Sequence, residues 1–127
     1  NKGQIQTPMI VKACLDVNKK VIVSYVPKLF SKPISPKTAT KIGGMLKRVT
    51  KTGTAKGVFD GLGQEVSGKT GTAQTDSGDK QPHSWFMGYA PSDNPKFAFS
   101  CVLENGGYGK TGAARAMNDM LQTLFSR

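Results

Sequence analysis

Hydrophobic positions form their most regular pattern in the last third of the chain. Residues 84–90 are an almost continuous apolar run, which predicts a central strand covered on both faces. Residues 96–104 alternate large apolar residues with smaller ones and predict a second strand, separated from the first by the turn-forming residues 91–95. Residues 113–125 carry apolar residues at helical spacing and predict an amphipathic helix. Two or three antiparallel strands with packed helices predict an α+β fold.

The first third of the chain predicts a helix, a strand and a connector. Thr7-Pro8 is a capping residue followed by proline, and the apolar residues after it fall at helical spacing as far as Asn18. Residues 20–26 are rich in Val and Ile, end at Pro27 and predict a strand. Residues 27–36 contain three prolines and predict an extended connector.

A second helix is predicted from Ser35-Pro36, which repeats the cap-then-proline pattern. Its apolar stripe consists of Ala39, Ile42, Leu46 and Val49. Gly43-Gly44 in the middle of this helix costs about 1 kcal/mol per glycine, so we expect tertiary packing to hold it. Such a pair is also typical of a place where a neighbouring element approaches closely.

Residues 50–82 are rich in Gly, Thr and Lys and have few large apolar side chains, so we expect them to contribute little to the core. Two stretches in this region nearly repeat each other, KTGTAK at 51–56 and KTGTAQ at 69–74. The pair is too short and too isolated for a solenoid. The polar residues 75–81 predict a hairpin loop.

Length and charge narrow the class of protein. The 127 residues suffice for one small domain or a piece of a larger one, and the start at Asn1, without an initiator Met, suggests a piece. A formal charge of +10 suggests nucleic acid, an anionic cell envelope or an acidic partner, but no dense run of basic residues occurs, so a solvated basic surface explains it most simply. No apolar run approaches the roughly 20 residues that span a bilayer.

The cysteines and the histidine do not indicate a metal site or a cofactor. Cys14 and Cys101 lie far apart, without a CxxC pair, and both sit in apolar patterns that predict buried free thiols. His83 could be imagined in a triad with Asp76 or Asp79, but no G-x-S-x-G elbow exists, so we interpret it as a residue at the start of a strand.

Two further features also have a simpler structural interpretation. The aromatic residues of 84–90 could stack on bases or sugars, but a strand in the core explains them better. Residues 106–111 faintly resemble a phosphate loop without its GxxxxGK[ST] spacing, and we expect a loop that borders a cleft.

The segment SGKTGTAQ, residues 67–74, offers a plausible binding surface. On a strand beside a cleft, the charge of Lys69 and the hydroxyls of Thr70 and Thr72 would suit a carboxylate. Gly68 and Gly71 would let the backbone of an extended peptide approach the strand edge. A KTG triplet alone is weak, because it also occurs at residues 51–53 and 110–112, but only the triplet at Lys69 precedes the HSWFMGYAP strand at this spacing.

This order of segments closely resembles the C-terminal half of a class B penicillin-binding protein transpeptidase domain. SGKTGTAQ, HSWFMGYAP, KFAFSCVLEN and the terminal amphipathic helix carry the resemblance. GQIQTPMIVKACLDVN is similar to the family's TP-initiated helix, and KTGTAKGVFDGLGQEV to its lead into the KTG strand. The resemblance implies a penicillin-binding-protein/β-lactamase-like fold, cross-linking of peptidoglycan stem peptides by acyl transfer, and acylation by β-lactams.

The family's motif assigns roles to four residues of this sequence. It implies that Lys69 supports the electrostatics of the site, that Thr70 and Thr72 bind the substrate or β-lactam carboxylate, and that the Thr72 backbone N–H forms half of an oxyanion hole. It implies that Gly71 lets the acyl donor approach. No cofactor or metal is expected.

One departure from the family decides what this chain can do alone. The family needs an S-x-x-K serine and an S-x-N motif before KTG, and residues 1–66 contain neither. Ser77-Gly-Asp-Lys80 and Ser92-Asp-Asn94 imitate them after KTG, and we attribute both to chance. We therefore expect residues 1–127 to be the C-terminal portion of one transpeptidase domain, inactive without the nucleophile-bearing part.

The resemblance also predicts where the parent protein works and what it meets. We expect a parent on the extracytoplasmic face of the bacterial membrane, with an anchor outside this chain, and the remainder of its own domain as partner. Nucleic acid is not an expected partner, and the isolated chain is expected to self-associate and to have low thermal stability. The alternative is a non-catalytic basic module that binds nucleic acid or an anionic polymer, with affinity that falls steeply with salt.

Overall fold

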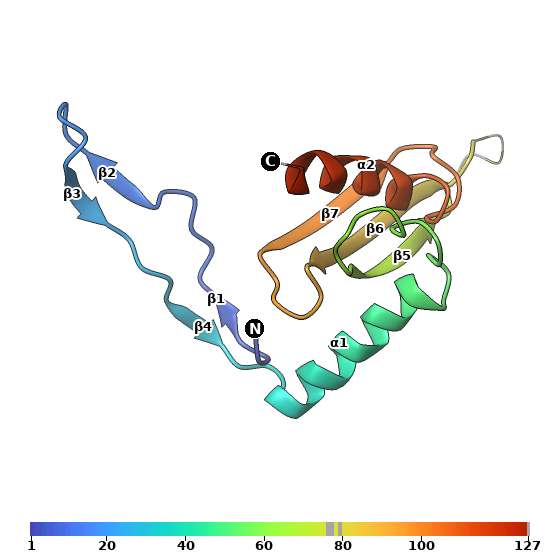
Figure 1. The fold of residues 1–127 in the computed structure, drawn as a ribbon, viewed down its shortest axis with the longest axis horizontal. Helices are drawn as coiled ribbons and strands as arrows, with labels where there is room; N and C mark the ends of the chain where they lie inside the picture. Colours follow the sequence, from blue (N-terminus) through green and yellow to red (C-terminus); the bar gives the residue numbers. More distant parts are fainter. Residues whose placement is uncertain (76–77, 79, 127) are drawn as a thin grey trace. The chain divides into compact units, whose positions relative to one another are not determined.

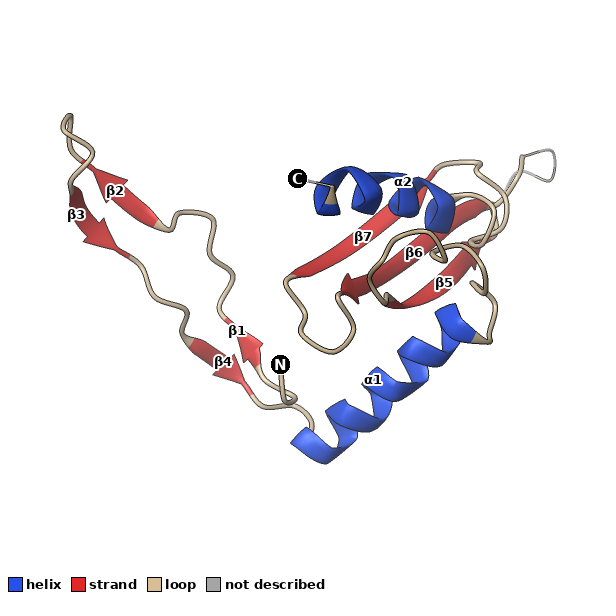
Figure 2. Ribbon diagram, in the orientation of Figure 1, coloured by secondary structure: helices blue, strands red, loops and turns tan. Residues whose placement is uncertain are grey.

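The computed structural model describes residues 1–75, 78 and 80–126, which divide into two compact units, Asn1–Lys41 and Ile42–Arg127. The first unit contains two antiparallel strand pairs (Figure 2). In it, β1 (Ile5–Gln6) pairs with β4 (Leu29–Ser31), and β2 (Ala13–Leu15) pairs with β3 (Val21–Ser24).

The helix predicted after Thr7-Pro8 is wrong, because this region forms β2 and its connection to β1. A tight turn closes the β2–β3 hairpin: the Asp16 carboxylate accepts hydrogen bonds from the backbone N–H groups of Asn18 and Lys20, both at 2.8 Å. This turn and the strand pairing satisfy the backbone in place of a helix. The strand predicted at residues 20–26 is confirmed as β3.

Helix α1 (Pro36–Lys51) begins where its capping pattern predicts. The Ser35 Oγ accepts a hydrogen bond from the Thr38 backbone N–H at 3.1 Å, as a residue at the N-cap does. The close approach predicted for the glycine pair is confirmed at Gly43, where an added Cβ would lie 3.0 Å from the Tyr89 Oη. At Gly44 no such neighbour lies within 4 Å.

The second unit contains a three-stranded antiparallel sheet in the order β5-β6-β7 (Figure 1). The strands are β5 (Ser67–Ala73), β6 (His83–Ala90) and β7 (Phe97–Leu103), and α2 (Ala113–Phe125) packs on β6 and β7. The sequence predictions of two strands followed by a helix in this region are confirmed, as is the α+β class. None of the helices within the described residues is long and apolar enough to cross a bilayer.

The core lies between the inner face of this sheet, helix α2 and the segment that precedes β5. Phe86 is fully buried; its ring is tilted against that of Phe59 and stacked on that of Phe99, with ring centroids 5.3 and 5.9 Å apart. The expectation that residues 50–82 contribute little to the core is wrong. The buried apolar residues include four from this region, Ala55, Phe59, Leu62 and Val66. Turns direct these few apolar side chains towards the core, and their spacing along the chain follows neither the helix nor the strand period.

Strand β6 is covered on one face only within the described part of the chain. Phe86 is 0% exposed, whereas Trp85 and Met87, which point to the opposite face, are 42% and 62% exposed. The prediction of a strand covered on both faces is therefore wrong here, because α2 packs on one face. The thiol prediction is also only partly correct, since Cys14 and Cys101 are free but Cys14 is exposed and Cys101 half-buried.

Candidate functional site

Strand β5 lies at an edge of the sheet and carries the KTG segment. Thr70 and Thr72 are paired with Phe86 and Ser84 of β6, so both threonines belong to the face on which the core packs. Lys69 is paired with Met87 and belongs to the opposite face. The structure thus brings the two threonines together, while the Lys69 ammonium donates a hydrogen bond to the Thr70 carbonyl oxygen at 2.8 Å.

The backbone of β5 offers hydrogen-bonding groups to the open edge. An added Cβ on Gly109 would lie 2.8 Å from the Gly71 carbonyl oxygen and 2.9 Å from that of Trp85, so these two oxygens lie between the strands. Gly71 and Trp85 are register partners. Because their carbonyl oxygens lie between the strands, we infer that they are a pair of the hydrogen-bonded type. Because such pairs alternate along an antiparallel ladder, the N–H and C=O groups of Thr70 and Thr72 point away from β6.

The glycine-rich loop before α2, which contains residues 106–111, lies against strand β5. Ser84 fixes the loop: its Oγ accepts a hydrogen bond from the Ala113 N–H at 2.8 Å and donates one to the Tyr108 carbonyl at 3.1 Å. An added Cβ on Gly109 would also lie 3.0 Å from the Thr70 Cβ. The loop predicted to border a cleft therefore contacts the KTG strand through Gly109.

Gly68 has a different role from the one predicted. An added Cβ there would lie 2.5 Å from the Phe86 Cζ and 2.8 Å from the Met87 carbonyl oxygen. The missing side chain makes room for the buried ring of Phe86, so Gly68 serves internal packing. The suggestion that Gly71 allows close approach of an acyl donor stays a prediction.

The last turn of α1 and the segment that follows it contact β5 and the residue before it. The Thr50 hydroxyl donates a hydrogen bond to the Val66 carbonyl oxygen at 2.6 Å. Thr54, in the first KTGTA stretch, has its Oγ1 3.1 Å from the Oγ1 of Thr70 in the second. Sequence reasoning missed both Thr54 and Gly109 as neighbours of the KTG strand; the near-repeat drew attention to the segment but did not indicate a contact.

An ion-pair cluster connects α1 to the segment just before β5 and to the turn between β6 and β7. Glu65 pairs with Lys47 and Lys51, and Lys47 also pairs with Asp93 at 3.0 Å. The hydrogen bond from Lys47, helped by that from Lys51, lowers the pKa of Glu65 below its ordinary value. The hydrogen bonds to Glu65 and Asp93 raise the pKa of Lys47.

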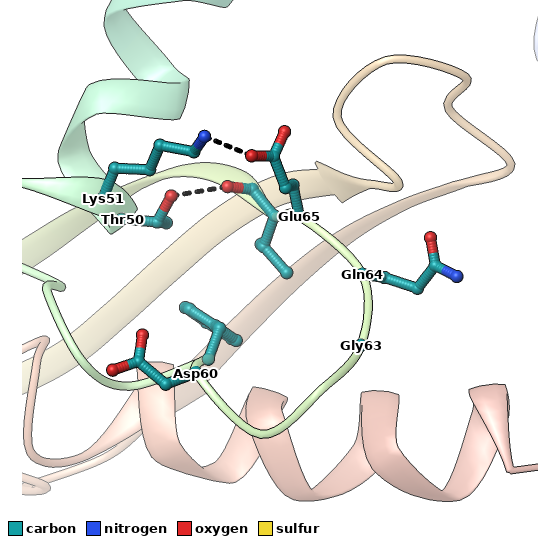
Figure 3. A pocket seen from close by; sticks show the side chains of 8 residues that line it. Thr50, Lys51, Asp60, Gly63, Gln64 and Glu65 are labelled. Carbon is teal, nitrogen blue, oxygen red and sulfur yellow. Dashed lines mark hydrogen bonds and ion pairs between the residues drawn. The ribbon is translucent and has the colours of Figure 1, made fainter.

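A pocket of about 280 Å³ lies beside this cluster (Figure 3). It is lined by Thr50, Lys51, Phe59, Asp60, Gly63, Gln64, Glu65 and Val66. Its lining includes none of the four residues to which the motif assigns roles (Lys69, Thr70, Gly71 and Thr72, here called the KTG-site residues). The charges of Lys51 and Glu65 are paired with each other. We assign this pocket no part in the chemistry.

The other candidates occupy structural positions. The His83 Nδ1 accepts a hydrogen bond from the Asn105 backbone N–H at 3.0 Å, as befits a residue at the start of a strand. Ser92 lies in the turn between β6 and β7, where its Oγ accepts a hydrogen bond from Ser67 at 2.9 Å.

Three residues invoked in these candidate motifs, Asp76, Ser77 and Asp79, lie outside the described residues. No group of three or more His, Cys, Asp and Glu side chains within the described part of the chain could hold a metal ion.

Comparison with known proteins identifies the family. Residues 1–122 match the model of the penicillin binding protein transpeptidase domain. The chain belongs to this family. Among curated relatives it is 28% identical over 120 residues to the peptidoglycan D,D-transpeptidase PbpA of Mycolicibacterium smegmatis, covering 91% of this chain. It is 33% identical over 132 residues to the peptidoglycan D,D-transpeptidase MrdA of Haemophilus influenzae, covering 90% of this chain.

Solved transpeptidase structures have the same fold. The imipenem acyl-enzyme of penicillin-binding protein A from M. tuberculosis aligns with 98% of this chain at a TM-score of 0.80 and 26% identity. The D,D-transpeptidase domain from Eggerthella lenta aligns with 99% at a TM-score of 0.78 and 29% identity. The resemblance read from the ordered motifs is confirmed, and a non-catalytic basic module is not favoured.

The match is to part of each relative. The chain spans 24% of the M. smegmatis protein and 20% of the H. influenzae protein, and 28% and 29% of the two solved chains. As a member of the penicillin-binding protein family, it has its KTG segment on an edge strand with the backbone of Thr70 and Thr72 facing outward. A family serine of the S-x-x-K type does not occur before this segment in residues 1–66.

Proposed function

We propose that residues 1–127 are the KTG-bearing C-terminal portion of one peptidoglycan D,D-transpeptidase domain. The observation that carries this proposal is the open edge of β5, to which Thr70 and Thr72 direct their backbone groups. An edge strand of this kind can hold an extended stem peptide by β-augmentation. The same groups can hold a β-lactam, whose acyl-enzymes are the subject of several related structures.

The four KTG-site residues have distinct tasks in this proposal. The hydroxyls of Thr70 and Thr72, which belong to the same face of β5, donate hydrogen bonds to the carboxylate of the peptide or β-lactam. The outward N–H of Thr72 stabilises the oxyanion, and Gly71 leaves space for the acyl donor. Lys69 adds positive charge beside the site, with its ammonium at the Thr70 carbonyl.

The reaction uses a serine outside this chain. Its Oγ bonds to the carbonyl carbon of the stem peptide or β-lactam, and the carbonyl electron pair moves to the oxygen, to which the Thr72 N–H donates a hydrogen bond. The oxyanion then re-forms the carbonyl, the C–N bond breaks, and the proton of the serine passes to the departing nitrogen. The amine of a second stem peptide later attacks the ester carbonyl. A new amide C–N bond forms, the ester C–O bond breaks, and a proton of the amine passes to the serine Oγ, which completes the cross-link and frees the serine. With a β-lactam, the nitrogen stays attached to the opened ring.

The partners and location follow from the same proposal. The nucleophile-bearing remainder of the domain is the partner that completes the cleft, and stem peptides and β-lactams are its ligands. The parent protein works on the extracytoplasmic face of the bacterial membrane, where peptidoglycan is cross-linked, and its anchor lies outside this chain.

The test is acylation by a reporter penicillin, followed by intact mass. The isolated chain should gain no adduct, and the full-length parent should gain one adduct, on a serine outside residues 1–127. A stable adduct on this chain would overturn the proposal. In the parent, Thr70→Val and Thr72→Val should each slow acylation by about tenfold or more, since each removes a hydrogen bond to a charged group. Thr123→Val, an exposed threonine of α2 bonded to the Asp119 carbonyl, is the matched control and should have no effect.

A further inference from the structure

The two KTGTA stretches touch each other through one side chain from each. The Thr54 Oγ1 and the Thr70 Oγ1 are 3.1 Å apart, which is hydrogen-bonding distance for two hydroxyls. Thr54 is not part of the KTG motif and is 16 residues away from Thr70 along the chain. This contact is therefore a tertiary one, and it meets a threonine that the proposed function uses.

Backbone hydrogen bonds and burial fix the position of Thr54. On one side, the Gly53 N–H donates to the Arg48 carbonyl at 2.9 Å. On the other, Ala55 is fully buried and its N–H donates to the Val49 carbonyl at 3.0 Å. Thr54 is thus held between two anchored neighbours, although its own side chain is exposed.

The surroundings of Thr70 leave its side chain few alternatives. It is half-buried, and Gly109 of the glycine-rich loop lies so close that an added Cβ would be 3.0 Å from the Thr70 Cβ. A threonine side chain has three staggered rotamers and a freely turning hydroxyl. The Thr54 hydroxyl provides a fixed partner that selects among these states.

We propose that Thr54 is a positioning residue for the carboxylate-binding hydroxyl of Thr70, an inference that rests on the proposed function. In this arrangement the Thr54 hydroxyl donates a hydrogen bond to the Thr70 Oγ1. Thr70 then keeps its own proton for the carboxylate of the substrate or β-lactam, because a hydroxyl has one donor and two acceptor sites. A donor that itself accepts a hydrogen bond is polarised and binds an anion more strongly.

The kinetic test uses the full-length parent and a penicillin in two forms, the free carboxylate and its methyl ester. Thr54→Val removes the hydroxyl while keeping the shape, and should slow acylation by the carboxylate form by about 3- to 10-fold, the range expected for one hydrogen bond. Acylation by the ester should change less than twofold. Thr54→Ser keeps the hydroxyl and should restore the wild-type preference for the carboxylate form.

A double-mutant cycle and a control variant separate positioning from general damage. In the background of Thr70→Val, the additional change Thr54→Val should have no further effect on the preference for the carboxylate form. Thr52→Val, in the same segment but bonded to the Arg48 carbonyl, should behave as wild type. Equal slowing of both penicillin forms by Thr54→Val, or undiminished slowing in the Thr70→Val background, would overturn the proposal.

A second readout does not depend on transpeptidase activity. In the chain of residues 1–127, the carbon-13 shift of the Thr70 methyl group reports its rotamer. Thr54→Val should move this shift towards a rotamer average, whereas Thr54→Ser and Thr52→Val should leave it in place. An unmoved Thr70 methyl in Thr54→Val would overturn the positioning role. Failure of the wild-type parent to be acylated would instead count against the proposed function alone.

Discussion

Ser84 is the fully buried polar residue that joins the sheet, the glycine-rich loop and helix α2. Its hydroxyl serves the Ala113 N–H and the Tyr108 carbonyl at once. Ser84→Ala leaves a buried N–H at the start of α2 without its partner, so we expect the free energy of unfolding to fall by about 1–3 kcal/mol. Denaturant unfolding measures this loss. Ser100→Ala, an exposed serine on β7, is the control, and equal effects of the two changes would contradict the role given to Ser84.

Gly109 occupies a position where no side chain fits. In Gly109→Ala the new methyl group would meet the Gly71 and Trp85 carbonyl oxygens below 3 Å, so the loop or the KTG strand has to shift. We expect a loss of about 1–3 kcal/mol in stability, typical of overpacking, and slower acylation of the full-length parent. Thermal unfolding and reporter-penicillin kinetics measure the two effects.

Gly61→Ala is the matched control for Gly109→Ala, because an added Cβ at Gly61 meets nothing within 4 Å. It should leave both stability and acylation near the wild-type values. A Gly109→Ala protein that is acylated as fast as Gly61→Ala would show that the loop does not constrain the KTG strand.

At the residue scale, the sequence predicted the KTG residues but not their supports. Lys69, Thr70 and Thr72 stand out because the motif is followed by a recognisable strand. Thr54 and Gly109 lie against the KTG strand through tertiary contacts. Contacts between residues far apart in the sequence cannot be predicted from spacing along the chain. The opposite faces of Lys69 and the two threonines follow from strand alternation, which the sequence does contain.

Among the elements, the contact between α1 and the start of β5 is the one that depends on charge. The pKa of Glu65 is lowered by its hydrogen bonds from Lys47 and Lys51, so the stability it contributes is present above its ordinary value of 4.5 and is lost as the pH falls through the lower, folded value. The pKa of Lys47 is raised, so its contribution is complete below 10.5 and is lost as the pH rises through the higher, folded value.

Glu65→Gln should therefore weaken the dependence of the free energy of unfolding on pH in the acidic range. At neutral pH this variant should be less stable than wild type, and the difference should shrink as the pH falls below 4.5. Denaturant unfolding at a series of pH values measures the difference. Added salt should reduce it as well, because the pairs are partly exposed. A difference that stays constant from neutral to strongly acidic pH would contradict this account.

The elements of the C-terminal half were predicted well, whereas in the N-terminal third the strand at residues 20–26 was predicted and the helix after Thr7-Pro8 was wrong. Strand β6 has an almost continuous apolar run, and β7 and helix α2 have patterns that match their period, so neighbouring elements only reinforce these local signals. The helix predicted after Thr7-Pro8 had a good capping signal, but the Asp16 turn and the pairing with β3 offered the backbone a different set of hydrogen bonds. Tertiary pairing of this kind overrides a local signal.

The whole molecule leaves many large apolar side chains in contact with solvent. They include Ile10 and Val17 in the first unit, and Trp85 and Met87 on the open face of the sheet. The strand pairs of the first unit are two-stranded, and such pairs are marginally stable in water. We expect the isolated chain to unfold below about 65 °C and its transition temperature to rise with protein concentration.

Calorimetry at several concentrations, with sedimentation for the molecular mass, tests this expectation. A cooperative transition well above about 65 °C that does not depend on concentration would contradict it. Addition of the nucleophile-bearing remainder of the parent domain should raise the transition temperature of this chain, because binding to the folded state stabilises it.

The five residues KTGTA adopt two different backbone forms in one chain. Residues 51–55 end a helix and continue into a turn, whereas residues 69–73 are extended within β5. A free KTGTA peptide therefore has no intrinsic conformation that distinguishes residues 69–73 from residues 51–55. An antibody raised against the free pentapeptide, or an inhibitor designed as its mimic, would lack the information needed to choose between the two. That information resides in strand β6 alongside.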